Sequence, residues 1–106
     1  MINGEAATLR RDDWPQVARV YRAWAYLDRG RAWGLKMKDR MIAFDENGKK
    51  LTGHVVRFFG PEEGLNSPRG FPIREGAILF IRMGQDRVSE GLEFRFDEKN
   101  DPAAIR

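Results

Sequence analysis

Phenylalanine and arginine residues lie close together at several points in the second half of this 106-residue chain. An exposed aromatic ring gives an unpaired base a surface on which to stack, and a neighbouring cation meets the phosphate beside that base. Arginine makes up 14 of the 19 basic residues, which favours forked contacts with phosphates and bases. The side chains predicted to bind nucleic acid in this way are Arg57, Phe58, Arg69, Phe71, Phe80 and Arg82.

A second group of cations lies in the first half of the chain. Between Arg19 and Arg40 there are seven basic residues and two acidic ones, a local surplus of five. Such a surplus attracts an anionic polymer, so we add Arg29 and Arg31 to the predicted nucleic-acid-binding residues. The alternative is a solvated charged surface whose only role is solubility.

The residue types that catalysis and metal binding need are scarce. The chain has no cysteine, which excludes disulfides, thiolate nucleophiles and zinc ribbons, and its one histidine is His54. No pair of carboxylates is positioned by helical spacing for acid–base chemistry. We therefore expect no catalytic residue, no metal and no cofactor, and a protein that is not an enzyme.

The first element predicted to position these residues is an amphipathic helix over residues 13–30, preceded by an N-terminal arm of residues 1–12. Asp13 is a suitable N-cap, Pro15 is tolerated in a first turn, and Gly30 is a natural stop. The apolar residues between them recur at steps of three and four, the period of a helix. They are Trp14, Val17, Val20, Tyr21, Trp24 and Leu27.

Short antiparallel strands are predicted over residues 40–106. The pair Asn47–Gly48 separates the apolar runs Met41–Phe44 and Leu51–Phe59, which is a strong hairpin signal. Residues 60–70 are rich in glycine, proline and polar side chains and predict a long surface loop. The remaining predicted strands are Phe71–Ile73, Ala77–Met83 and Leu92–Asp97.

These elements predict a single α+β domain over residues 1–106. It combines the N-terminal amphipathic helix with about five short antiparallel strands, arranged as a small barrel of the OB-like or SH3-like kind. Both faces of Ala77–Met83 carry apolar side chains, so another element is expected to cover the second face. If the helix covers it, Phe58 and Phe80 are core residues and the binding surface is lost.

Several short segments after His54 follow a familiar order. They read Val56-Arg57-Phe58-Phe59-Gly60, then Arg69-Gly70-Phe71-Pro72-Ile73, then Leu79-Phe80-Ile81-Arg82, then Gly91-Leu92-Glu93-Phe94-Arg95-Phe96, and finally Pro102-Ala103-Ala104-Ile105. Residues 54–105 thereby resemble a cold-shock domain, whose corresponding segments include Val-Lys-Trp-Phe-Asn, Lys-Gly-Phe-Gly-Phe-Ile and Val-Phe-Val-His. The resemblance implies an oligonucleotide-binding barrel that stacks bases on its aromatic side chains. The chain departs from the family's pattern at Pro72, which replaces the second aromatic residue, and in a longer first loop.

The sequence therefore predicts a small basic cytoplasmic protein that binds single-stranded RNA or DNA through arginine and phenylalanine on a sheet face. One alternative is a protein-interaction module or homodimer that uses the Trp-rich helix and has no nucleic-acid role. Another is a small-ligand pocket between the helix and the sheet. The longest apolar runs, Ala23–Leu27 and Ala77–Ile81, are far shorter than the ~18 residues that a membrane span needs, so no membrane partner is expected.

Overall fold

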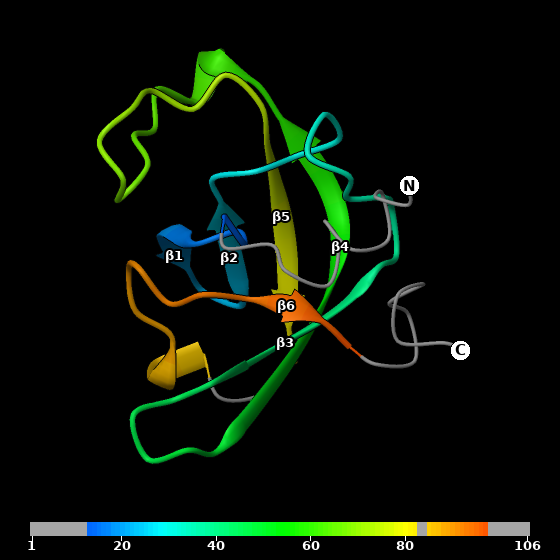
Figure 1. The fold of residues 1–106 in the computed structure, drawn as a ribbon, viewed down its shortest axis with the longest axis vertical. Helices are drawn as coiled ribbons and strands as arrows, with labels where there is room; N and C mark the ends of the chain where they lie inside the picture. Colours follow the sequence, from blue (N-terminus) through cyan, green and yellow to red (C-terminus); the bar gives the residue numbers. More distant parts are fainter. Residues whose placement is uncertain (1–12, 83–84, 98–106) are drawn as a thin grey trace, which may run out of the picture.

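The computed structural model describes residues 13–82 and 85–97. Within them six strands form one antiparallel sheet in the order β1-β2-β5-β4-β3-β6 (Figure 1). The strands are β1 (Val17–Tyr21), β2 (Trp24–Leu27), β3 (Arg40–Phe44), β4 (Lys50–Phe59), β5 (Gly76–Ile81) and β6 (Arg95–Phe96). Two short 3-10 turns, η1 (Pro61–Glu63) and η2 (Gln85–Arg87), are the helical elements of the described chain. The fold is therefore mainly β rather than α+β.

The sheet rolls up so that its two outermost strands meet. The residues just before β6 pair with the start of β1 through a bridge between Gln16 and Glu93. Main-chain hydrogen bonds on both sides of this bridge run from Val17 N to Leu92 O at 2.9 Å and from Phe94 N to Pro15 O at 2.9 Å. We call this junction the seam. It makes the sheet barrel-like, with an inner face turned to the core and an outer face turned away from it.

Alternating burial assigns the side chains to the two faces. In β4, Leu51, Gly53 and Val55 are buried, whereas the residues between them are exposed. Most of the buried positions of β1–β5 pack into one apolar cluster inside the rolled sheet. Its largest fully buried members include Phe94, Leu27, Met41, Leu51, Leu79 and Ile81. The apolar inner face thus provides the burial that stabilises the sheet.

The predicted helix over residues 13–30 is wrong, because this segment forms the antiparallel β1–β2 hairpin. The period of two is broken by an irregularity in β1 between Val17 and Arg19 and by the turn Arg22–Ala23. Each break shifts the positions of the apolar residues along the sequence. With both shifts, these residues recur at steps of three and four, as they would in a helix. The turn also contains no glycine or asparagine, the residues that usually mark a tight hairpin turn in a sequence. Arg22 adopts the left-handed conformation there, with φ 56°.

The predicted hairpin around Asn47–Gly48 is confirmed, because β3 and β4 pair from Arg40–His54 to Phe44–Lys50. Asp45 organises the turn. Its Oδ1 accepts hydrogen bonds from the main-chain N–H groups of Asn47 at 2.9 Å and Lys49 at 2.8 Å. Its Oδ2 accepts a hydrogen bond from Arg87 Nη1 at 2.7 Å, which ties the turn to η2.

The Arg87 hydrogen bond, followed by that from Lys49 N–H, holds the pKa of Asp45 below its ordinary value of 3.8. The folded state therefore binds the proton more weakly than the unfolded chain does, and this stabilisation is complete above the ordinary pKa and is lost as the pH falls through the lowered one. We expect Arg87→Gln to lose less stability than the parent between pH 7 and pH 3, measured by urea unfolding. Lys49→Gln serves as the control, and equal losses in the parent and Arg87→Gln would contradict the assignment.

Residues 60–75 form a loop that folds back over one end of the outer face. Leu65 and Ile73 of this loop pack with Phe59 and Ile78 in a second apolar cluster outside the main core. The predicted loop over residues 60–70 is thereby confirmed, but Phe71–Ile73 is not a strand and contributes one isolated bridge, between Asn66 and Pro72. The predicted N-terminal arm, Met83 and the segment Pro102–Ile105 lie outside the described residues.

Asp28 anchors this loop to the sheet. The Asp28 carboxylate is fully buried and accepts hydrogen bonds from Gln16 N at 2.9 Å, Ser67 Oγ at 2.7 Å and Arg69 Nη1 at 2.7 Å. Arg69 Nη2 also donates to Trp14 O at 2.6 Å. One buried carboxylate therefore joins the approach to β1, the end of β2 and the 60–75 loop.

Candidate nucleic-acid interface

One row of side chains crosses five strands on the outer face. Strand register pairs Tyr21 with Trp24, Trp24 with Phe80, Phe80 with His54, and His54 with Arg40. Residues paired directly across antiparallel strands project from the same face of the sheet. We call these five residues the outer row. Together they form an aromatic surface across β1, β2, β5 and β4. Arg40 on β3 adds a cation at one end of this surface.

Three rings of the outer row, those of Trp24, Phe80 and His54, are in contact along the row. The centroid of Trp24 lies 5.3 Å from that of Phe80, and the centroid of Phe80 lies 5.7 Å from that of His54. Tyr21 is 47% exposed, and Trp24 and Phe80 are half-buried. Trp24 also packs against the second apolar cluster, whereas Tyr21 and His54 are exposed, so the row is accessible to a ligand at these positions.

Two hollows lie on the outer face, one on each side of the Trp24–Phe80 contact. The basic hollow has a volume of about 820 Å³ and is lined by Lys38, Arg40, Thr52, Gly53, His54, Phe80 and Arg82. The narrow hollow has a volume of about 360 Å³ and is lined by Tyr21, Trp24, Tyr26, Val56, Arg57 and Ile78. No acidic residue of the described chain lines either hollow.

Further cations border the narrow hollow. The guanidinium carbon of Arg19 lies 5.4 Å from the centroid of the Tyr26 ring and 5.8 Å from that of Tyr21. Arg22 lies 5.4 Å from the Tyr21 ring centroid. On the opposite side, Arg40 Nε is 3.4 Å from Asp97 Oδ2, but the Arg40 side chain is still 53% exposed. Positive charge therefore flanks the aromatic row at both ends.

Three of the residues predicted from the sequence lie on this surface. Phe80 is in the outer row, Arg82 lines the basic hollow, and Arg57 lines the narrow hollow. The predicted cover over Phe80 was the helix, and the β1–β2 hairpin that replaces it lies beside β5 in the sheet instead of over it. Phe80 consequently shares its face with Trp24.

Phe58 points to the other face. An irregularity in β4 between Val55 and Arg57 inserts one residue and reverses the alternation that follows. Phe58 therefore pairs with Ala77 and packs against the inner core, while Arg57 turns outward. The guanidinium carbon of Arg31 lies 4.3 Å from the Phe58 ring centroid, so these two predicted residues contact each other away from the outer row.

The other predicted residues also lie elsewhere. Arg69 is held by Asp28 and the Trp14 carbonyl. Phe71 and Arg29 contact each other at a cavity beside the 60–75 loop, with 5.2 Å between the guanidinium carbon and the ring centroid. Of the eight predicted residues, three therefore lie on the outer face, Phe58 packs against the inner core, and the other four lie in the segments after β2 and before β5.

Sequence reasoning missed Tyr21 and Trp24 of the outer row, and Tyr26 of the narrow hollow, because all three were assigned to a helix. The available signal was the concentration of valine and aromatic residues over 17–26, which is typical of strands. The Trp-rich helix on which the interaction alternative depended does not exist, and Trp14 is buried against Trp33 and Phe96.

Neither a metal-binding cluster nor a membrane-spanning helix is found in the described part of the chain. No group of three histidine, cysteine or acidic side chains is placed to hold a metal ion within residues 13–82 and 85–97. Over the same residues, no helix has the length and apolar character needed to cross a bilayer.

The outer face is thus an aromatic row between two cation-lined hollows, carried on a closed sheet. Comparisons of this chain with family models, with curated proteins and with solved structures find no match.

Proposed function

We propose that this protein binds single-stranded nucleic acid on the outer face of its sheet and is not an enzyme. The observation that supports the proposal is the outer row, in which aromatic rings from neighbouring strands lie between cations. Unpaired bases stack on such rings with about 1–3 kcal/mol per base, whatever their sequence. Duplex bases are already stacked on one another, so a single strand is the better ligand for a surface that offers ring faces.

The cations give the proposed ligand its direction across the sheet. Bases occupy the row through Trp24 and Phe80, and the phosphates between them lie toward Arg82 and Lys38 on one side and Arg57 on the other. Among the described residues no acidic side chain lines either hollow, so none of them repels a phosphate chain there.

The deciding variant is Phe80→Leu, which keeps an apolar side chain in the sheet but removes the ring. We expect it to weaken binding of a fluorescently labelled single-stranded oligonucleotide by about ten- to a hundred-fold, measured by anisotropy. Phe44→Ala is the matched control, because Phe44 is 54% exposed and lies outside both hollows. Melting temperatures of both variants separate a loss of binding from a loss of folding.

The same titrations at several salt concentrations test the electrostatic part. The parent's affinity is expected to fall with salt, with a slope of about 0.7 for each phosphate neutralised on a single strand. Arg82→Gln removes one such contact and flattens the slope, whereas Lys49→Gln, in the distant β3–β4 turn, leaves it unchanged. The proposal would be overturned if the parent protein bound no oligonucleotide. It would also be overturned if sedimentation showed a dimer that forms through this face.

A further inference from the structure

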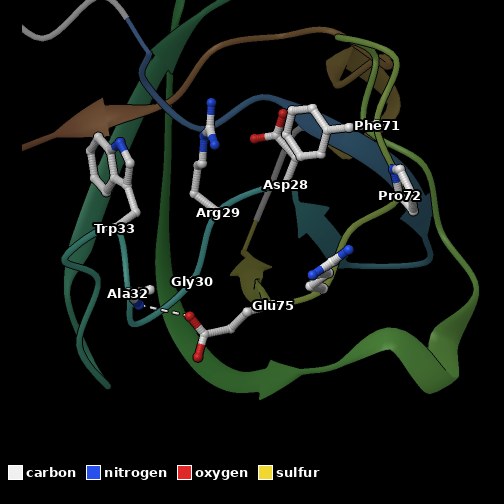
Figure 2. Close-up of a pocket in the computed structure, with 9 residues that line it drawn as sticks. Asp28, Arg29, Gly30, Ala32, Trp33, Phe71, Pro72 and Glu75 are labelled. Atoms are coloured by element: carbon white, nitrogen blue, oxygen red, sulfur yellow. Dashed lines mark hydrogen bonds between the residues drawn. The ribbon is translucent and has the colours of Figure 1, made fainter.

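A separate cavity of about 480 Å³ lies where β2 ends and β5 begins. It is formed by residues 28–33, which follow β2, and residues 71–75, which precede β5. Figure 2 shows Arg29 standing between Trp33 and Phe71, with Glu75 on the adjoining wall. We call this space the Arg29 cavity. None of its lining residues belongs to the outer row or to either hollow.

Arg29 carries the main chemical feature of the cavity. Its guanidinium stacks on the Phe71 ring, with 5.2 Å between the guanidinium carbon and the ring centroid. Its Nε is buried and has no hydrogen-bond partner among the described residues. Leaving a charged donor buried and unsatisfied is costly, and such groups are normally paired with protein, water or a bound ion. Because this Nε has almost no exposed surface, a ligand in the cavity would meet the guanidinium at its two Nη groups instead.

The remaining charges around the cavity leave it positive. Asp28 lines it, but the Asp28 carboxylate is already bonded to Arg69, Ser67 and Gln16 N. Glu75 is held by the main-chain N–H of Ala32, which donates to Glu75 Oε1 at 2.7 Å. Among the charged lining residues that the structure describes, Arg29 and Arg74 are then opposed by Glu75, because Arg69 balances Asp28.

We propose that the Arg29 cavity binds a small oxyanion, a carboxylate or a phosphate group. The two Nη groups of an arginine lie side by side and match two oxygens of such a group, which a lysine cannot reproduce. Arg74 supplies a second positive charge, and Trp33 and Phe71 form walls that suit a planar ring attached to the anion. This site is independent of the proposed nucleic-acid surface, since it shares no residue with it.

The test is calorimetric titration of the folded protein with three probes at constant ionic strength: inorganic phosphate, adenosine monophosphate and benzoate. Binding of at least one probe is expected, with a rise in melting temperature. Tighter binding of adenosine monophosphate than of phosphate assigns a phosphate ester that uses the ring walls. Tighter binding of benzoate than of phosphate assigns a carboxylate. The absence of binding by all three probes would overturn the proposal.

Three variants locate the site. Arg29→Gln and Arg29→Lys are both expected to weaken the binding of the best probe at least ten-fold, because the first removes the charge and the second removes the forked donor edge. Glu75→Gln keeps an acceptor for Ala32 N–H but removes a negative charge, so it should strengthen binding of the best probe several-fold. This variant tests the site even if the Arg29 variants fail to fold. Lys49→Gln is the control for general electrostatics. Parent-like binding in Arg29→Lys, or unchanged binding in Glu75→Gln, would contradict the assignment.

Oligonucleotide affinity in Phe80→Leu reports on the outer face alone, so the failure of one proposal is distinguishable from the failure of the other.

Discussion

Replacing Asp28 with Ala is expected to lower the free energy of unfolding by about 3–5 kcal/mol, the usual cost of removing one partner of a buried ion pair. The Asp28 side chain is completely buried, and the Arg69 side chain paired with it is only 22% exposed. The substitution leaves Arg69, Ser67 and the Gln16 N–H without their acceptor. It therefore releases the 60–75 loop from the sheet as well as creating an unpaired charge.

Urea unfolding of the parent, Asp28→Ala and Asp28→Asn measures this effect. Asp28→Asn keeps the shape of the side chain and one acceptor oxygen, so its loss should be smaller than that of Asp28→Ala. Glu46→Ala, in the exposed β3–β4 turn, is the control and is expected to change stability by no more than about 0.5 kcal/mol. A loss below about 1 kcal/mol for Asp28→Ala would show that the carboxylate does not hold the loop.

The second large effect is expected at Phe94, whose replacement by Ala should cost about 3–5 kcal/mol. Phe94 is 0% exposed and is among the largest side chains of the inner core. Its main-chain N–H also donates to Pro15 O, so the ring fills the core next to the seam. Removing the ring leaves a cavity in the core beside the seam.

Thermal and urea unfolding of Phe94→Ala can be compared with Phe44→Ala, which removes the same ring from a position that is 54% exposed. Phe44→Ala is expected to change stability by less than about 0.5 kcal/mol. Similar losses in the two variants would mean that Phe94 is not part of the core as described.

The sequence predicts the β3–β4 hairpin well because its signals are local. Asn47–Gly48 favours a tight turn, and the flanking runs supply strand-forming residues on either side. The β1–β2 hairpin is missed because its turn uses Arg22 in a left-handed conformation and because β1 contains an irregularity. Both features are decided by pairing with β5 and with the seam, which the local pattern does not reveal.

The same limit applies to the site. A single inserted residue in β4 places Arg57 outward and Phe58 inward, although the bare alternation from Leu51 predicts the reverse. Arg69 looks like a free cation in the sequence, and its partner Asp28 is distant along the chain. Phe80 and Arg82 are found because β5 is regular, so their faces follow from simple alternation.

The seam also bears on the order in which the chain folds. Its pairing joins Gln16 to Glu93, near the two ends of the described chain, whereas the β1–β2 and β3–β4 hairpins close over short turns. Contacts between distant residues form late, because the entropy of closing a long loop is lost before the contact stabilises it. Until the seam closes, β1 is an edge strand, and its unpaired main-chain groups would template association with a second chain. Pairing at the seam therefore protects this edge as well as completing the core.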